Sequence, residues 1–388
     1  MCIRDSNYFV GGDEGLKNDF SSLVHDLHDA KEYGSILRIS PVNFSALYAR
    51  LAAVEKEGSF DALAVQSTVL PLVQVAEVLS QQYDVVVTNP PYMGSSGMSA
   101  KLSDYVKNNY PDSKSDLFAV FIERCGQMTG QNRYQAMITQ HAWMFLSSFE
   151  KLRKKLLQSI EVVNMAHLGA RAFDEIGGEV VQTTSFVFRN VFDKGYCGTY
   201  SRLLEPATQQ GKEELFLSGQ NRYTAQQTNF SKIPGSPIAY WVSEKIIKLY
   251  DGKLVSDYAF SDGQILTGDN DKYIRLIWEV NATSIHKMGS WMLHAKGGEF
   301  RRWWGNLDSV VCWKREAILH YKSDKIARFP KESILFQEGI TWTLISSNSI
   351  FGTRYLPESQ TFNKAAATLL PNDKNIIMYL LAFTNTII

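Results

Sequence analysis

The residues best suited to chemistry in this 388-residue sequence are Asn89-Pro90-Pro91-Tyr92. An exocyclic amine on a flat ring is a poor nucleophile, because its lone pair is delocalised into the ring. The side-chain oxygen of Asn89 and the carbonyl oxygen of Pro90 are two acceptors that would hold the amine hydrogens and free the lone pair to attack an electrophilic methyl group. Tyr92 would stack on the ring, a contact worth roughly 1–3 kcal/mol per base. The four residues therefore predict a pocket for an amine-bearing ring.

The sequence before this motif predicts the element that positions it. The valines of Tyr83–Thr88 favour a buried strand. Two prolines cannot continue a strand, because each lacks an N–H group and has a fixed φ. In open α/β sheets, ligands bind outside the carboxyl ends of the strands, which is where the motif would lie. The alternative is a strand followed by an ordinary proline turn.

The order of helix-forming and strand-forming stretches along the chain predicts two domains. Helical spacing and strand-forming runs alternate through the first 190 residues, so the region from Tyr83 to Phe188 predicts the second half of a doubly wound sheet. The predicted helices are 20–33, 44–54, 60–80, 116–128 and 147–157, and the predicted strands are 83–88, 134–139, 160–168 and 180–188. We assign residues 1–200 to a catalytic domain, 201–250 to a linker or helical passage, and 251–388 to a second domain of short strands and aromatic residues, itself ending early.

The formal net charge is zero, but its distribution is uneven. Residues 271–332 contain 12 Lys and Arg against 7 Asp and Glu, and six of the eight tryptophans lie between Trp278 and Trp342. Interleaved basic and aromatic residues suit phosphate contact and base stacking. A Trp-rich core surrounded by solvated lysines is the alternative.

The four cysteines lie far apart, so their spacing predicts neither a metal site nor a disulfide framework, and a reducing cytoplasm fits. No apolar run approaches 18 residues, so we expect no transmembrane helix.

Several longer stretches of the sequence support the prediction made from the four-residue motif. They are Asn89 to Gly94, Tyr110 to Phe118, Thr139 to Glu150, His167 to Phe173, Gly177 to Thr184, Thr267 to Asp271, Lys296 to Arg301 and Gly339 to Trp342. Together these blocks resemble the adenine-specific DNA methyltransferases of BREX phage-defence systems. Restriction–modification fusion enzymes share the same plan more loosely.

The resemblance implies a fold and a set of roles. The fold would be α/β, a partial Rossmann-like class I methyltransferase sheet followed by an α+β target-recognition domain. The enzyme would transfer a methyl group from S-adenosylmethionine to the N6 atom of an adenine flipped out of double-stranded DNA, without a metal ion. Other phage-defence proteins would be partners. Asn89, Pro90, Pro91 and Tyr92 would form the catalytic motif.

The resemblance also implies roles for residues outside the motif. Phe173 would supply a second aromatic wall for the base, although a core phenylalanine is the alternative. Lys296, Arg301 and Arg302 would contact DNA, with a solvated surface role as the alternative. His141 and His167 have no metal or nucleophile partner in the sequence, so we expect structural roles for them.

One expected motif is missing. The methyltransferases that the chain resembles hold their cofactor with a glycine-rich turn after the first strand, yet the only glycine cluster before Asn89 is Gly11 to Gly15, and no apolar strand precedes it. We therefore expect the chain to be a fragment, truncated at both ends, that binds S-adenosylmethionine poorly by itself and is inactive alone.

Three alternative functions remain at this point. The same four residues serve enzymes that methylate glutamine side chains or ribosomal RNA, but the long basic and aromatic second half argues against a compact enzyme of that kind. The chain could also be a non-catalytic DNA-recognition module. A third alternative is the methyltransferase part of a type II restriction–modification fusion enzyme.

Overall fold

The computed structural model describes residues 8–173, 181–345 and 351–386. They form two compact units, Met1–Asp251 and Gly252–Ile388. The block predicted at 177–184 therefore lies partly outside the described residues. The helices and strands of each unit are given below with the residues that position the motif.

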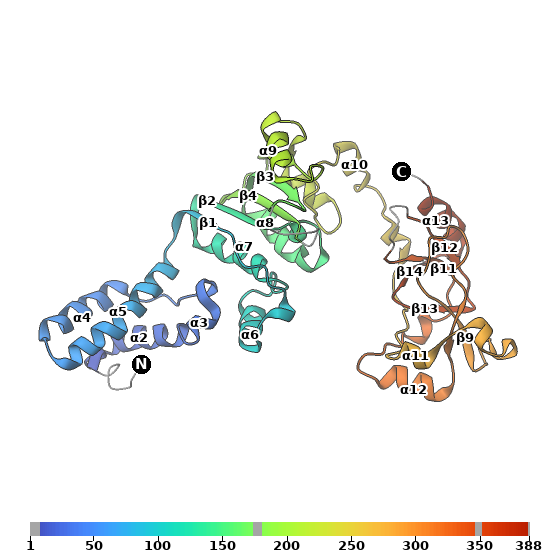
Figure 1. Cartoon of the computed structure of the whole chain (residues 1–388), viewed down its shortest axis with the longest axis horizontal. Helices are drawn as coiled ribbons and strands as arrows, with labels where there is room; N and C mark the ends of the chain where they lie inside the picture. The colour runs from blue at the N-terminus through green and yellow to red at the C-terminus, as the bar shows by residue number, and fades with distance from the viewer. Residues whose placement is uncertain (1–7, 174–180, 346–350, 387–388) are drawn as a thin grey trace. The chain divides into compact units, whose positions relative to one another are not determined.

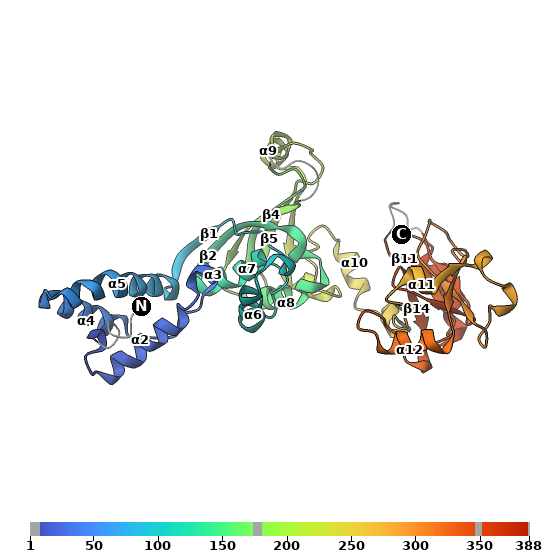
Figure 2. The ribbon, with the colours of Figure 1, turned by 60° about the horizontal axis from the view of Figure 1, so that its bottom comes forward.

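The first unit opens with a bundle of helices that lies apart from the sheet (Figures 1 and 2). The helices are α2 (Glu14–Asp26), α3 (Ala30–Tyr33), α4 (Phe44–Glu57) and α5 (Phe60–Ser80). Asp13, Asn43 and Ser59 cap α2, α4 and α5, each accepting a hydrogen bond from the backbone three residues on. The three long helices enclose a core of their own, which includes Leu47 and Val69.

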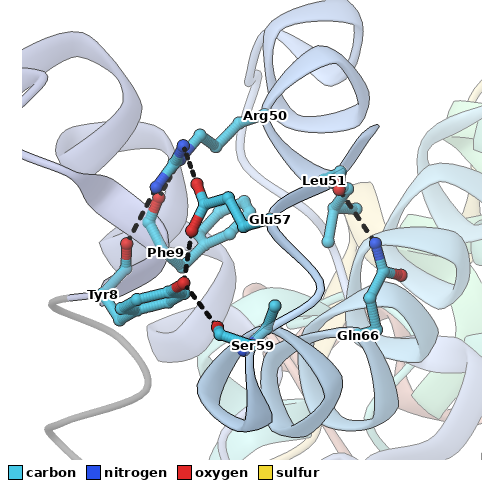
Figure 3. Close-up of polar contacts among 8 residues, drawn as sticks. Tyr8, Phe9, Arg50, Leu51, Glu57, Ser59 and Gln66 are labelled. Atoms are coloured by element: carbon cyan, nitrogen blue, oxygen red, sulfur yellow. Dashed lines mark hydrogen bonds and ion pairs between the residues drawn. The ribbon is translucent and has the colours of Figure 1, made fainter. Parts of the chain in front are cut away.

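A polar cluster fastens the first described residues to the bundle (Figure 3). Arg50 donates to the carbonyl oxygens of Phe9 (2.7 Å) and Tyr8 (3.1 Å) and pairs with Glu57 at 3.4 Å. The Tyr8 hydroxyl donates to Glu57 and lies 3.0 Å from the hydroxyl of Ser59. Tyr8 and Phe9 are thereby tied to the connection between α4 and α5.

Helix α5 departs from the prediction that no segment is long and apolar enough to cross a membrane. Among the described residues it alone meets that test, by length and composition. Val65, Val69 and Val73 on one face are buried in the bundle. The opposite face carries exposed apolar side chains, among them Phe60 and Leu63. The helix therefore has both a packed face and an open one.

A six-stranded sheet forms the rest of the first unit, in the order β1-β2-β4-β3-β5-β6. Its strands are β1 (Tyr83–Thr88), β2 (Thr129–Gln140), β3 (Glu161–Gly169), β4 (Thr183–Arg189), β5 (Cys197–Arg202) and β6 (Arg222–Gln226). Strand β1 is parallel to β2, β3 is parallel to β5, and β4 runs antiparallel between β2 and β3. Strands β1, β2 and β3 therefore end at the same edge of the sheet.

Four helices lie in the connections between the strands: α6 (Ala100–Asn109), α7 (Leu117–Met128), α8 (Glu150–Ser159) and α9 (Gln209–Ser218). Phe118 and Ile122 of α7 and Leu152 of α8 pack with Phe186 and Phe188 of β4 in the main core. This is the predicted α/β arrangement of a partial class I methyltransferase sheet, and the predicted fold class is confirmed.

The segment 201–250, expected to be a passage between domains, is instead part of the first unit. Strand β6 pairs with β5, and Tyr240 is buried in the main core. Arg153 of α8, itself 1% exposed, donates to the carbonyl oxygens of Gly235 and Ser236. The polar, glycine-containing composition of the segment hid these contacts, because they are made by backbone groups and by single aromatic side chains. The segment ends in helix α10 (Glu244–Leu249).

Strand β1 was predicted to be buried, but only one face of it is. Val86 packs against the main core, whereas Val85 and Val87 are 56% and 70% exposed. Strand β1 is also the edge of the sheet. A valine run fits a strand buried on both faces, and no described residue covers its second face or its outer edge.

The second unit contains two four-stranded sheets, of order β13-β9-β10-β8 and β12-β11-β14-β7. The strands are β7 (Ala259–Phe260), β8 (Ile274–Leu276), β9 (Trp291–Ala295), β10 (Ser309–Cys312), β11 (Gly339–Thr343), β12 (Arg354–Leu356), β13 (Gln360–Phe362) and β14 (Ala366–Pro371). The helices are α11 (Asn270–Tyr273), α12 (Arg315–Ser323) and α13 (Ile377–Thr384). Short strands and helices built on separate small cores make this an α+β unit, as the sequence predicts.

Candidate functional site

The loop Asn89-Pro90-Pro91-Tyr92 leaves the sheet directly after β1, at the carboxyl end of the strand. Asn89 and Pro91 are exposed, Pro90 is buried and Tyr92 is half-buried. Within the described residues, neither the Asn89 side chain nor the Pro90 carbonyl oxygen has a hydrogen-bond partner. Both oxygens are thus available to a ligand, as the predicted chemistry requires.

Tyr92 is held on the sheet by two contacts. Its ring meets the ring of Phe118 edge-on, with centroids 6.1 Å apart, and its hydroxyl lies 3.4 Å from the carbonyl oxygen of Ile138 in β2. Burial raises the pKa of the Tyr92 hydroxyl above its ordinary value, so the side chain stays neutral at physiological pH. A neutral ring fixed at one edge can act as a stacking surface on its exposed side.

A single carboxylate fixes the end of the loop to helix α7. Asp116 is the N-cap of α7, as its sequence position predicts, and its side chain accepts from the backbone N–H groups of Phe118 (3.3 Å) and Met93 (3.0 Å). The backbone adds a hydrogen bond from Leu117 N–H to the Met93 carbonyl oxygen at 3.0 Å. Burial raises the pKa of Asp116, although its hydrogen bonds from backbone N–H groups oppose the shift. The motif is therefore clamped between a strand and the start of a helix.

A chain of three polar rings lies at the same edge of the sheet. His141 Nδ1 is 2.7 Å from His167 Nε2, and His167 Nδ1 is 3.0 Å from the hydroxyl of Tyr240. Burial, with repulsion from His141, lowers the pKa of His167 to about 3, and burial lowers the pKa of His141. A neutral imidazole has one donor and one acceptor nitrogen, so the three groups must donate in a single direction. The sequence indicated only structural roles here, because the partners lie 26 and 73 residues apart.

Phe173 follows β3 and is half-buried. Strands β2 and β4 separate β3 from β1, which places the ends of the two strands roughly 14 Å apart at about 4.8 Å per strand. In the described part of the chain, no ring contact joins Phe173 to Tyr92. Tyr92 therefore lies against β2, but Phe173 makes no ring contact with Tyr92 among the described residues. The role of Phe173 stays a prediction.

The three predicted DNA contacts lie in the second unit, after β9. Lys296 is exposed and borders a pocket, and Arg301 is exposed and lies 3.6 Å from Glu299. Arg302 is half-buried, with its guanidinium 5.7 Å from the ring centroid of Phe300. All three come from one connection, residues 296–308, between β9 and β10.

Three of the six tryptophans of this region are exposed rather than packed in a core. Trp278, Trp303 and Trp304 are 68%, 52% and 55% exposed, and the other three between 278 and 342 are half-buried. Trp304 stacks on Tyr355 with ring centroids 6.1 Å apart. Exposed indole rings beside Arg301 and Arg302 are the combination that base stacking and phosphate contact need.

The described residues do not form a pocket for S-adenosylmethionine of the expected kind. Strand β1 is preceded by the helices α2 to α5 rather than by a strand and a glycine-rich turn. Gly11 and Gly12 do adopt positive φ, but helical residues lie on both sides of them. The glycine cluster is thus a turn between helices, in agreement with its rejection on sequence grounds.

The family comparison agrees with this geometry. Residues 38–173 match the model of the Eco57I restriction-modification methylase family. The matched region contains β1, the Asn89–Tyr92 loop, Asp116 and α7, and it ends at Phe173. The first unit therefore resembles a restriction–modification methylase.

The curated relatives extend the likeness over nearly the whole chain. The chain is 39% identical over 97% of its length to the adenine-specific methyltransferase PglX of Lacticaseibacillus casei (strain Zhang). It is 36% identical over 92% of its length to the adenine-specific methyltransferase BrxX of Escherichia coli O9:H4 (strain HS). These matches confirm the resemblance to adenine-specific methyltransferases of BREX phage-defence systems. The chain spans about a third of the length of both relatives (34% and 30%).

A solved structure supports the fold. The type IIL restriction-modification enzyme MmeI, determined in complex with DNA, aligns with a TM-score of 0.50 at 13% identity. The alignment covers 79% of this chain and 43% of that chain. At this identity the likeness concerns the fold alone.

Proposed function

We propose that this chain carries the target-base pocket and the DNA-recognition unit of a site-specific DNA adenine N6-methyltransferase in a phage-defence system. The observation that carries the proposal is the loop Asn89–Tyr92, which Asp116 holds in place. Two oxygen acceptors of the loop have no partner among the described residues, and they lie beside a half-buried ring. The similarity to PglX and BrxX supports the choice of adenine.

In the proposed mechanism, adenine is flipped out of double-stranded DNA and stacks on Tyr92. Flipping costs a few kcal/mol, which stacking and polar contacts offset. The Asn89 side-chain oxygen and the Pro90 carbonyl oxygen each accept a hydrogen bond from the N6 amino group. Pro91 has a fixed φ and holds the backbone of the loop in that geometry.

The second unit would hold the DNA around the target. Exposed Trp303 and Trp304 lie in the same connection as Arg301 and Arg302, so stacking and phosphate contact would come from one segment. Sequence readout would require further contacts to base edges, for which an arginine fork matches guanine.

The methyl donor would be S-adenosylmethionine, held by residues other than those described for this chain. We expect the purified chain to bind it weakly, because no glycine-rich turn precedes β1 in the described part of the chain. Calorimetric titration of the chain with S-adenosylmethionine checks this. Micromolar binding would mean that the cofactor site has been misplaced.

The function itself is tested by Asn89→Ala in the full-length enzyme. Loss of one acceptor in the transition state should lower the rate of adenine methylation by about 100-fold or more. DNA binding, measured by fluorescence anisotropy, should change little, because Asn89 is one small contact in a large interface. Tyr92→Phe is the matched control, since it keeps the stacking ring and loses only the hydroxyl contact to Ile138. A normal methylation rate in Asn89→Ala would refute the proposed roles.

A further inference from the structure

The second unit contains a recess to which the proposed function assigns no ligand. Its volume is about 780 Å³, within the range of roughly 300–1,000 Å³ typical of small-molecule sites. It is enclosed by four stretches of chain and by the exposed side chain of Ile326. The stretches are 265–270, 296–298, 343–345 and 363–365.

The charged side chains in the described lining of the recess are both cationic. Lys296 and Lys364 both border it, and its described lining residues include no Asp or Glu. Asp269 lies between two lining residues, but its side chain caps α11 and accepts from the backbone N–H of Lys272 at 3.0 Å. In the part of the chain that the structure describes, no ion pair joins either lysine to a carboxylate. The nearby carboxylate of Glu299 lies outside the lining and pairs with Arg301 at 3.6 Å. Two unneutralised ammonium groups favour an anion.

Asn363 adds a donor whose orientation is fixed. Its side-chain oxygen accepts from the backbone N–H groups of Ala365 (2.9 Å) and Ala366 (3.1 Å), and only the oxygen can accept. The amide N–H₂ group is therefore the end left for a ligand. Gly297 lets the backbone approach closely at this wall, because a Cβ there would lie 2.9 Å from the Ala365 carbonyl oxygen.

The rim of the recess is apolar. Ile326 and Ile345 are 74% and 87% exposed, and Leu344 is half-exposed beside them. An apolar rim next to a cluster of cationic and amide donors fits a ligand with a flat, weakly polar ring and an attached anion. A nucleotide has both parts, since its base offers acceptors and a stacking face and its phosphate carries the charge.

We propose that this recess binds a single unpaired nucleotide. The proposal rests on the proposed DNA-binding function and deepens it. A paired duplex does not fit a recess of this volume, so the nucleotide must either be displaced from a DNA helix or come from solution as a free nucleoside monophosphate. The base lies against Ile326, Leu344 and Ile345, and the phosphate lies between Lys296 and Lys364.

The test compares ligands that differ only in the unpaired nucleotide. Fluorescence anisotropy with this chain measures a fully paired duplex, the same duplex with one bulged nucleotide, and the same duplex with an abasic bulge. The bulged duplex should bind about tenfold more tightly than the other two. Free nucleoside monophosphate should compete for the bulged duplex, and inorganic phosphate at equal concentration should compete far less.

Two sets of variants test whether the preference for the bulged duplex arises in the recess. Lys296→Gln with Lys364→Gln should abolish the preference for the bulge, and so should Ala365→Trp, which fills the recess without changing charge. The control, Lys314→Gln with Lys331→Gln, removes the same charge from exposed positions of the second unit outside the recess. Circular dichroism checks that each variant is folded.

The outcomes separate this inference from the proposed function. DNA binding without a preference for the bulge, or with a preference that the recess variants leave intact, overturns the nucleotide site and leaves the proposed function standing. Equal competition by inorganic phosphate reduces the recess to an anion site and also overturns it. Binding of nucleoside monophosphate without any DNA binding supports the recess, with a soluble nucleotide as its ligand, and counts against the DNA-recognition role of the second unit.

Discussion

At the scale of single residues, the candidate site depends on which polar groups are already satisfied. Among the described residues the Asn89 side chain has no hydrogen-bond partner, whereas Asp116 uses its carboxylate to hold the loop. The sequence predicted Asn89 and Tyr92 as site residues from residue type and order alone, and their roles stay predictions. It placed Asp116 at a helix start, since capping is a local property. It could not connect Asp116 to Met93, which lies 23 residues away.

Replacing Asp116 by alanine should remove both the cap of α7 and the clamp on the loop. We expect the free energy of unfolding to fall by about 1–2 kcal/mol, because N-cap losses have this size. Asp116→Asn should lose less, since a side-chain oxygen remains as an acceptor. Urea unfolding of the purified chain measures both variants.

The control for this prediction is Asp13→Ala, which removes the N-cap of α2 far from the motif. Asp13→Ala should destabilise the bundle without changing methylation by the full-length enzyme, whereas Asp116→Ala should lower both stability and methylation. Equal methylation by the two variants would argue against a clamp.

At the scale of elements, strand β1 is the least satisfied part of the sheet. Its outer backbone edge is free among the described residues, and Val85 and Val87 face solvent. The sequence pattern predicted the strand and its limits correctly, because a β-branched run followed by prolines is a local signal. Burial of its second face could not be predicted, since burial depends on what lies against the strand.

The exposed edge should make the isolated chain self-associate through β1. Val87→Lys places a charge on the uncovered face of this edge strand at little cost to folding, because Val87 is 70% exposed. We expect the variant to sediment as a smaller species than the wild type at the same concentration. Analytical ultracentrifugation measures this.

Leu146→Lys is the matched control, because Leu146 is also exposed but lies away from the strand edge. It should leave self-association unchanged. If Val87→Lys and wild type have the same sedimentation distribution, the edge of β1 does not drive association.

At the scale of the whole molecule, the chain consists of two units with separate cores. The sequence predicted a methyltransferase-type sheet followed by an α+β region. It misassigned the 201–250 segment, because β6 and Tyr240 are integrated by long-range contacts that leave no local pattern. The contacts among His141, His167 and Tyr240 escaped prediction for the same reason, because these residues are far apart in the sequence.

Buried neutral histidines should make the chain sensitive to acid. The pKa of His167 falls to about 3 in the folded chain, mainly because of burial, whereas an unfolded histidine takes up a proton near pH 6.5. Its contribution to stability is therefore complete above about pH 6.5 and is lost as the pH falls towards 3, at about 1.4 kcal/mol per pH unit.

His167→Gln removes this titration. Between pH 7.5 and 5.0 the variant should lose about 2 kcal/mol less stability than the wild type, although it starts less stable. Urea unfolding at the two pH values measures the difference, with the exposed His286→Gln as the control. Parallel losses in wild type and His167→Gln would assign the acid sensitivity to other groups.

The carboxylate of Asp116 has one more consequence, for protein engineering. The same side chain accepts hydrogen bonds from the end of the motif loop and from the first turn of α7. The loop and that turn therefore form one rigid unit. Transplanting the four motif residues onto another scaffold would leave them without their anchor. A transferable cassette must run from β1 through the first turn of α7, and swaps between relatives should place their junctions outside that span.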